Sequence, residues 1–326
     1  MQNKDYIPNI DLSAIRDGNN AFKNSNEIAN KIKIASEDIG FFTVTNHGIP
    51  ITKILSLISV CKKFFHLSND EKIKIAPKKW NPNTNTIYRG YFPSEVNGKE
   101  GLDIGDPRLT KDMSDLIKKD KFEVNHDMSF LDPQWQIIIN DYFDRIHNLG
   151  ILIFKTIISA YSNNTNLADE AFIRPKTLST LRFNYYPKQE KPVEVSAQDG
   201  VALGCETHVD SGIMTILYQD KKGGLQVQNR HTLEWYDVPH DPNAFVINTG
   251  LALEYLTNGR MKATNHRVLF NQEERISIPF FFEPSYDFKL DPKYLDITEK
   301  NKYDINNYED FLTNSLKKFV EYDRPN

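Results

Sequence analysis

The stretch LSTLRFNYYP, residues 178–187, marks the point where the pattern of this sequence changes from helical to extended. Within it, Leu181, Phe183 and Tyr185 alternate with residues of a second face, to which Asn184 and Tyr186 belong. Such a period of two is typical of a β-strand whose two faces meet different surroundings. We therefore expect a strand here, with Asn184 and Tyr186 on the same side.

Further short strand signals follow at close intervals, with turn residues such as Gly223-Gly224 and Asn258-Gly259 between them. The predicted strands cover residues 214–218, 225–227, 235–238, 245–248, 268–270 and 276–282. Many short strands separated by turns indicate a sandwich or barrel, the class to which jelly rolls belong.

The sequence on either side of this strand-rich part predicts helices. Apolar residues at helical spacing predict helices over 25–39 and 135–157, and another that starts at Pro50. Residues 41–45 predict one strand, whereas the glycine- and proline-rich stretch 80–133 predicts a mostly irregular segment. We expect one α+β domain over residues 1–326. It has a helical and irregular N-terminal portion (1–133), a strand-rich core (178–285) and a C-terminal helix (306–321).

Composition excludes several classes of protein. The chain of 326 residues has 40 basic and 44 acidic side chains, a net charge of −4, which disfavours a nucleic-acid partner. Its apolar runs are shorter than the roughly 18 residues that a membrane span needs. Two cysteines, Cys61 and Cys205, predict a reducing, cytoplasmic setting. The sequence carries no signal of oligomeric state.

Three short segments of the strand-rich part could together bind a metal ion. His208-Val209-Asp210 places an imidazole and a carboxylate on one face of an extended chain, and His266 follows 56 residues later. Two histidines and one carboxylate are the ligand set of non-haem Fe(II) oxygenases, which leave adjacent coordination positions for other molecules. Arg275-Ile276-Ser277 adds a second pair on one strand face.

Each of these segments has a simpler interpretation when taken alone. With 8 histidines and 26 aspartates, about 0.6 His-x-Asp matches are expected by chance. An isolated His266 could be a hydrogen-bonded structural histidine, and an isolated Arg275 a surface ion pair. However, Arg275 stands among apolar residues of a predicted strand, and a buried arginine needs an anionic partner.

Several motifs, in their order, resemble those of the isopenicillin N synthase-like Fe(II)- and 2-oxoglutarate-dependent oxygenases. The resemblance covers most of the chain. The motifs that carry it are residues 40–50 (GFFTVTNHGIP), 64–72 (FFHLSNDEK), 89–91 (RGY), 99–105 (KEGLDIG), 184–187 (NYYP), His208-x-Asp210, His266 and Arg275-x-Ser277.

The resemblance implies a double-stranded β-helix, or jelly roll, with helices packed outside. It implies that His208, Asp210 and His266 hold Fe(II). It also implies that Arg275, Ser277, Tyr186 and Asn184 bind 2-oxoglutarate. The implied reaction uses O₂, with ascorbate as a possible supporting reductant, to oxidise a C–H bond of a small molecule, releasing succinate and CO₂. Arg89 and Tyr91 are the candidate substrate-binding residues.

Three other functions stay open from the sequence. The first is an isopenicillin N synthase-like Fe(II) oxidase that does not use 2-oxoglutarate, because that enzyme keeps an Arg-x-Ser pair. The second is a non-catalytic ligand-binding or interaction protein on the same fold. The third, a hydrolytic zinc site, is disfavoured by Arg275-x-Ser277.

Overall fold

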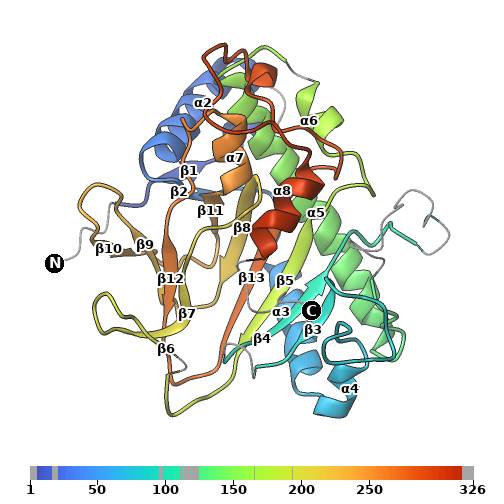
Figure 1. Ribbon diagram of the computed structural model, residues 1–326. Coiled ribbons are helices and arrows are strands. Elements are labelled where there is room, and N and C mark those ends of the chain that lie inside the picture. Colours follow the sequence, from blue (N-terminus) through green and yellow to red (C-terminus); the bar gives the residue numbers. More distant parts are fainter. Residues whose placement is uncertain are drawn as a thin grey trace.

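Two β-sheets face each other in the computed structural model, and helices cover the outer side of the larger one (Figure 1). The structure describes residues 6–16, 21–94, 98–110, 113, 125–164, 166–192 and 194–317. The larger sheet has eight strands in the order β1-β2-β11-β8-β13-β5-β4-β3, and the smaller has five in the order β10-β9-β12-β7-β6. This is a jelly-roll core, as predicted.

The strands are short and mostly antiparallel; β1 and β2 pair in parallel. Their bounds are β1 Asn9–Asp11, β2 Phe41–Thr45, β3 Gly90–Phe92, β4 Glu100–Ile104, β5 Thr180–Tyr186, β6 Glu194–Val195, β7 Ala202–His208, β8 Met214–Gln219, β9 Leu225–Gln228, β10 Trp235–Asp237, β11 Phe245–Thr249, β12 His266–Leu269 and β13 Arg275–Phe282.

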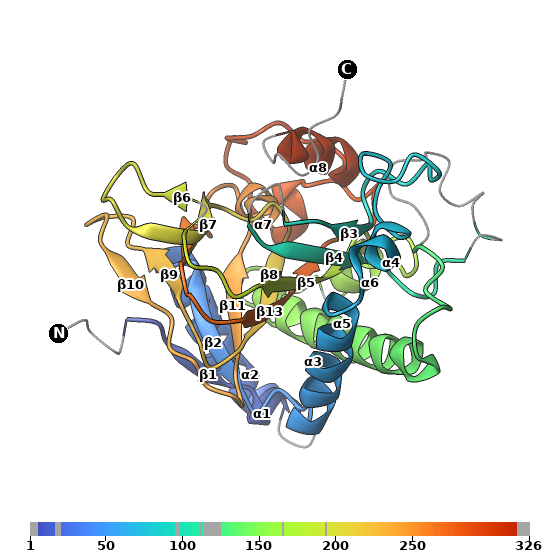
Figure 2. The same cartoon turned by 90° about the horizontal axis from the view of Figure 1, so that it is seen from below.

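The helices are α1 Ser13–Arg16, α2 Ala21–Asp38, α3 Ile51–Phe65, α4 Asn69–Ile73, α5 Pro133–Ser159, α6 Leu167–Ala171, α7 Leu251–Leu256 and α8 Tyr308–Leu316, with a 3₁₀ helix, η2, at Pro292–Leu295. Figure 2 shows α2, α3 and α5 on one side of the large sheet and α8 on the other. Among the helices of the described ranges, none has the length and apolar character required to cross a bilayer.

The period-two pattern of the central strands divides the core into two clusters. On β13, Ile276, Ile278 and Phe280 are buried in the large cluster between the sheet and the helices. On the opposite face of the large sheet, Tyr186 of β5 belongs to the smaller cluster, which lies between the two sheets. Val268 of β12 joins this cluster from the smaller sheet. The alternate residues of β5 and β13 therefore face the interior of the jelly roll.

Most predicted elements are confirmed, with differences at their ends. Ser68 caps α4 through a reciprocal pair of hydrogen bonds with Glu71. Helix α2 begins at Ala21, earlier than the predicted start at Ser25. The C-terminal helix begins at Tyr308, and the end of the predicted range 306–321 lies outside the described residues.

The stretch 80–133 is less irregular than predicted, because it contributes β3 and β4 to the large sheet. Strand β4 pairs with β5 from Glu100 to Ile104, which extends the sheet beyond the segment 178–285. The division into portions 1–133 and 178–285 stays a prediction about domains. Strands from both portions nevertheless share one sheet.

Gly150 provides a test of how tightly α5 packs on the sheet. A Cβ at Gly150 would lie 2.6 Å from Cδ2 of Phe282, whose ring stacks on Phe172 with centroids 3.9 Å apart. Replacing glycine with alanine inside a helix would by itself stabilise the protein. In Gly150→Ala, however, the added methyl group overpacks the core, and we expect the free energy of unfolding to fall by about 1–3 kcal/mol. Urea unfolding measures the change. The control Asn148→Ala lies on the exposed side of α5 and should change it by less than about 0.5 kcal/mol.

Candidate active site

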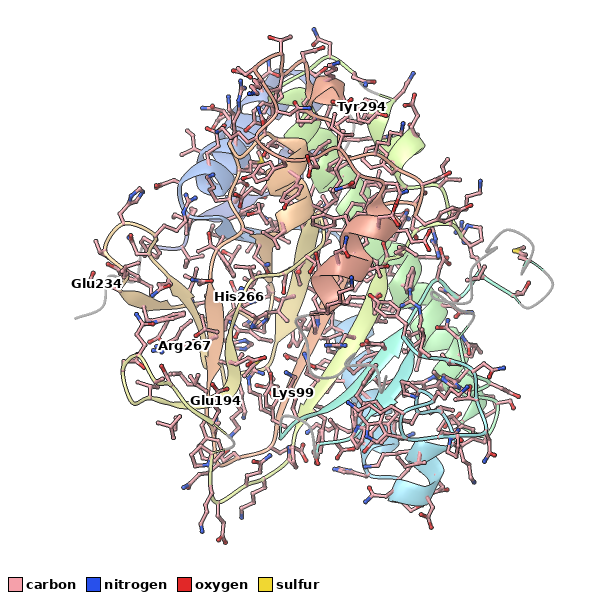
Figure 3. All side chains as sticks on the ribbon, viewed as in Figure 1. Lys99, Glu194, Glu234, His266, Arg267 and Tyr294 are labelled. Atoms are coloured by element: carbon pink, nitrogen blue, oxygen red, sulfur yellow. The ribbon has the colours of Figure 1, made fainter. Side chains whose placement is uncertain are left out.

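The strand register brings the two predicted histidine ligands together. His266, the first residue of β12, pairs directly with His208, the last residue of β7, and their ring centroids lie 4.2 Å apart. Asp210 follows in the loop after β7. Its Oδ1 lies 3.6 Å from Nε2 of His208 and 3.6 Å from Nε2 of His266. Figure 3 shows His266 between the two sheets.

Hydrogen bonds fix which atoms of this cluster point inward. Nδ1 of His208 lies 2.8 Å from the carbonyl of Glu206, and Nδ1 of His266 lies 3.1 Å from the carbonyl of Thr264. Because a carbonyl only accepts, each Nδ1 carries a proton, so Nε2 is the ring nitrogen that remains to face Asp210. A histidine that ligates a metal uses this arrangement, since the second nitrogen orients the ring.

The carboxylate of Asp210 is oriented in a similar way. Its Oδ2 accepts hydrogen bonds from Oγ1 of Thr215 and from Nδ2 of Asn248, which lies 2.8 Å away. Oδ1 is therefore the oxygen that faces both imidazoles. Thr215 and Asn248 were not predicted, although each is a polar residue within a predicted buried strand, and that pattern could have identified them.

The charges of the cluster suit a cation. Burial opposes ionisation of Asp210, but His266 and His208 and the two hydrogen bonds outweigh it and lower the pKa of the carboxyl below its ordinary value. Burial, with the neighbouring His208, lowers the pKa of His266, so this imidazole is neutral near pH 7.

The three ligand atoms all lie within 4.8 Å of one another. Bonds of about 2 Å to one ion would require only a small contraction of this group. Across the described ranges it is the one such cluster of three potential ligands.

The four residues predicted to bind 2-oxoglutarate lie on two paired strands. Arg275 of β13 pairs with Tyr186 of β5, and Ser277 pairs with Asn184. The guanidinium of Arg275 lies 4.7 Å from the centroid of the Tyr186 ring, and its Nε donates to the carbonyl of Gly223. A small cavity lined by Tyr186, Arg275 and Gly204 opens beside them.

Two buried atoms in this group have no hydrogen-bond partner. They are Nη1 of Arg275, a residue that is 2% exposed, and Oδ1 of Asn184. A buried guanidinium nitrogen without an acceptor is costly, and a carboxylate is its natural planar partner. The residues present therefore fit a co-substrate that carries a carboxylate. Lys99, which was not predicted, adds a positive charge near this group, because its ammonium lowers the pKa of Tyr186 against the effect of burial. Its Nζ also lies 3.3 Å from Sγ of Cys205.

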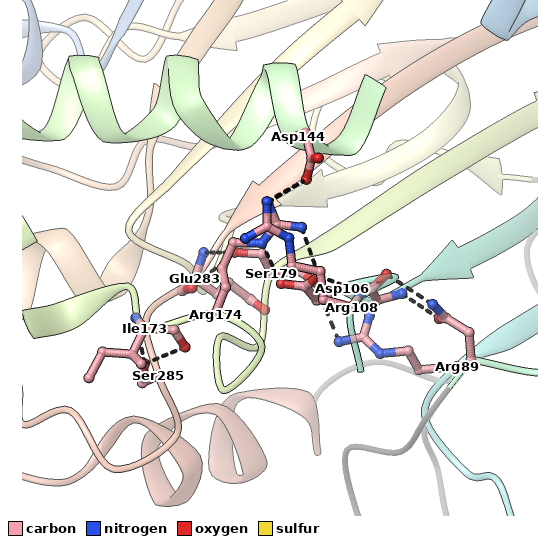
Figure 4. A network of polar contacts seen from close by, with 11 residues as sticks. Arg89, Asp106, Arg108, Asp144, Ile173, Arg174, Ser179, Glu283 and Ser285 are labelled. Atoms are coloured by element: carbon pink, nitrogen blue, oxygen red, sulfur yellow. Dashed lines mark hydrogen bonds and ion pairs between the residues drawn. The ribbon is translucent and has the colours of Figure 1, made fainter. Parts of the chain in front are cut away.

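The predicted substrate-binding residues Arg89 and Tyr91 make contacts within the protein. Nη1 of Arg89 donates to Oγ1 of Thr180 at 2.7 Å, and Nη2 lies 3.3 Å from the carbonyl of Leu178. Nη2 also lies 3.4 Å from the carbonyl of Ser179, and Figure 4 shows these two residues. The hydroxyl of Tyr91 donates to Glu100, and its ring belongs to the cluster on the helix side of the sheet. The structure does not bring either residue to the His208 cluster, and their role stays a prediction.

Comparisons with known proteins agree with this geometry. The 2OG-Fe(II) oxygenase superfamily matches residues 177–284, and the N-terminal family of non-haem dioxygenases in morphine synthesis matches residues 7–135. Flavonol synthase/flavanone 3-hydroxylase of Petunia hybrida is 31% identical over 323 residues, covering 97% of this chain and 84% of that protein. Isopenicillin N synthase of Streptomyces jumonjinensis is 28% identical over 295 residues, covering 88% and 87%. Among solved structures, a full-length Neurospora crassa protein in complex with alpha-KG and 5-formyluracil shares the fold, with a TM-score of 0.78, 24% identity and 95% coverage of each chain.

Thr215→Val tests whether the support of Asp210 matters for metal binding. The substitution keeps the shape of the side chain and removes the hydroxyl that donates to Oδ2. Loss of such a supporting group typically weakens a metal site by about 10–100-fold. We expect this loss in the affinity for Mn(II), measured by calorimetry. Thr52→Val, on the exposed side of α3, is the control. An affinity equal in both variants would contradict the role given to Thr215.

Proposed function

This chain belongs to the 2OG-Fe(II) oxygenase superfamily, and on that premise we propose that His208, Asp210 and His266 hold the iron of an enzyme that oxidises a small molecule. The family makes the chain a non-haem Fe(II)- and 2-oxoglutarate-dependent oxidoreductase. The assignment of ligands is supported by one observation above all: the two Nε2 atoms and Oδ1 of Asp210 point at one another while their other polar atoms are hydrogen-bonded.

Each of the three ligands contributes differently. Asp210 brings one negative charge, which partly neutralises a divalent ion, and Thr215 and Asn248 hold it in place. His208 and His266 would each offer one Nε2 to the ion, and three protein ligands would leave coordination positions for other molecules. Iron with 2-oxoglutarate and O₂ supplies the oxidising power when bound, and succinate and CO₂ are the co-products.

The 2-oxoglutarate would lie between this cluster and Arg275. We propose that Nη1 of Arg275 and the hydroxyl of Ser277 bind its distal carboxylate, with Tyr186 beside them. The position of Arg275 is fixed by its bond to Gly223 and by the Tyr186 ring, so the guanidinium orients the co-substrate without reorganising. Asn184, whose Oδ1 has no partner, would lie nearer the chelating end.

We propose that the prime substrate is a small molecule and that the reaction is hydroxylation. Relatives of this chain include enzymes named for small-molecule substrates, such as flavonol synthase/flavanone 3-hydroxylase. The net charge of −4 supports this over a nucleic-acid substrate. A reducing, cytoplasmic compartment is proposed from the two cysteines, which are not joined to each other.

Anaerobic calorimetry tests the proposed function directly. We expect the Mn(II)-loaded protein to bind 2-oxoglutarate and the metal-free protein to bind it at least about tenfold more weakly, because chelation supplies part of the affinity. His208→Ala should abolish Mn(II) binding, whereas the control His231→Ala, on an exposed turn, should not. Retention of metal by His208→Ala, or absence of any heat with 2-oxoglutarate, would refute the assignment. The second result would favour an oxidase that does not use the keto acid.

Arg275→Leu separates the co-substrate site from the metal site. We expect Mn(II) affinity to stay unchanged and 2-oxoglutarate affinity to fall by about 100-fold, since a buried charge-assisted pair contributes roughly 3 kcal/mol. Arg260→Leu removes an exposed arginine that pairs with Glu299, and it serves as the control. Unchanged 2-oxoglutarate binding by Arg275→Leu would show that its carboxylate lies elsewhere.

A further inference from the structure

An amine and a thiol from opposite sheets meet inside the jelly roll. Nζ of Lys99 lies 3.3 Å from Sγ of Cys205, although the two residues are 106 positions apart in the chain. Lys99 directly precedes β4 of the large sheet, and Cys205 lies within β7 of the small sheet. A covalent bond between these two atoms would therefore join the two sheets.

An irregularity in β7 turns the thiol of Cys205 toward the interior. His208 pairs with His266, but Val268, two residues further along β12, pairs with Cys205, three residues back along β7. The extra residue of β7 is a β-bulge, which changes the face on which the following side chains lie. Cys205 accordingly packs on the cluster between the sheets, to which Val268 and Tyr186 belong.

The pair is accessible to a small oxidant, whereas the second cysteine of the chain is not. Lys99 and Cys205 are each partly exposed, but Cys61 is buried in the cluster on the helix side of the sheet. The residues that precede the pair, Gly98 and Gly204, line the small cavity beside the proposed co-substrate site. Because oxidation of a thiol depends on its exposure, a peroxide should react with Cys205 before Cys61.

We propose that Cys205 and Lys99 form a reversible covalent bond, a sulfenamide, when a hydroperoxide oxidises the protein. A sulfenic acid condenses with a nitrogen that is held within reach, and the amine of Lys99 already lies at hydrogen-bond distance from the sulfur. The flexible four-carbon stem of a lysine allows its nitrogen to cover the remaining distance. In a reducing compartment such an oxidation is transient and regulatory, since thiols restore the cysteine.

The bond forms in two steps. In the first, the Cys205 sulfur attacks one oxygen of hydrogen peroxide, so that an S–O bond forms and the O–O bond breaks. The sulfur loses two electrons, the peroxide gains them, and the departing hydroxide takes the thiol proton and becomes water. In the second step, Nζ of Lys99 attacks the sulfur; an S–N bond forms and the S–O bond breaks. The hydroxide leaves as water with one ammonium proton, a second proton goes to solvent, and no further electrons are transferred.

Resting on the proposed function, this bond would weaken the binding of 2-oxoglutarate. The ammonium of Lys99 becomes a neutral nitrogen, so one positive charge is lost near Tyr186 and Arg275. The bond would also hold β4 and β7 at a fixed separation beside the site. Because 2-oxoglutarate is a dianion, we expect its affinity to fall by at least about tenfold.

Mass spectrometry of the full chain tests the bond without turnover. The Mn(II)-loaded protein is treated with hydrogen peroxide, and its intact mass and tryptic peptides are compared with those of the untreated protein. We expect a product that is lighter by two hydrogen atoms and a peptide in which Lys99 and Cys205 are joined. Dithiothreitol should restore the original mass. Anaerobic calorimetry should show that the affinity for 2-oxoglutarate falls on oxidation and recovers on reduction.

Variants identify the two partners of the bond. Lys99→Arg keeps the positive charge, but a guanidinium does not lose its proton to attack the sulfur, so Cys205 should stop at the sulfenic acid and react with dimedone. Lys188→Arg, on the exposed surface, is the control and should form the bond as the native protein does. A disulfide would also remove two hydrogen atoms, and therefore Cys61→Ala should keep the loss. Urea unfolding establishes that each variant is folded.

The outcomes separate this proposal from the proposed function. A native protein that only gains oxygen, or a two-hydrogen loss that persists in Lys99→Arg or disappears in Cys61→Ala, would overturn the bond. If the reduced protein does not bind Mn(II) or 2-oxoglutarate, the proposed function fails, while the masses still decide whether the bond forms. If the bond forms and the affinity for 2-oxoglutarate stays the same, its effect on the co-substrate is overturned.

Discussion

The pairing of His266 with His208 across β12 and β7 is the constraint on which the rest of the site depends. Adjacent antiparallel strands bring paired residues within about 5 Å, so the register alone places the two imidazoles side by side. The loop after β7 then needs only two residues to return a carboxylate to the same point. Main-chain carbonyls orient both rings, and therefore the backbone of the smaller sheet builds most of the ligand geometry.

Strand β13 carries the residues proposed to bind the co-substrate carboxylate, Arg275 and Ser277, on one of its two faces. The opposite face is buried against the helices, which fixes the register of the strand. A slip of one residue would turn Arg275 and Ser277 away from the interior. The packing of α5 against β13 therefore stabilises the fold and also fixes the direction in which the site residues of β13 point.

The polar groups of the interior fall into two kinds. Some are satisfied within the protein, such as Asp103 with Arg182, or Arg89 with Thr180. Others, such as Arg275 Nη1 and Asn184 Oδ1, have no partner although they are buried. Proteins rarely leave buried polar atoms unpaired, so the second kind indicates where ligands contact the chain. Arg89 belongs to the first kind, because its hydrogen bonds are made within the protein, although its charge suggested a contact with the substrate.

The sequence alone determined the period-two strands, a sandwich or barrel class and the order of His208, Asp210, His266 and Arg275, because alternation and spacing are local properties. It did not show that β3 and β4, short strands in a glycine-rich stretch, extend the large sheet, since sheet edges form through distant pairing. Only the tertiary structure decided which atoms have partners. It revealed Thr215 and Asn248 behind Asp210, and Lys99 beside Cys205, because hydrogen bonds between residues far apart in the chain leave no periodic signal in the sequence.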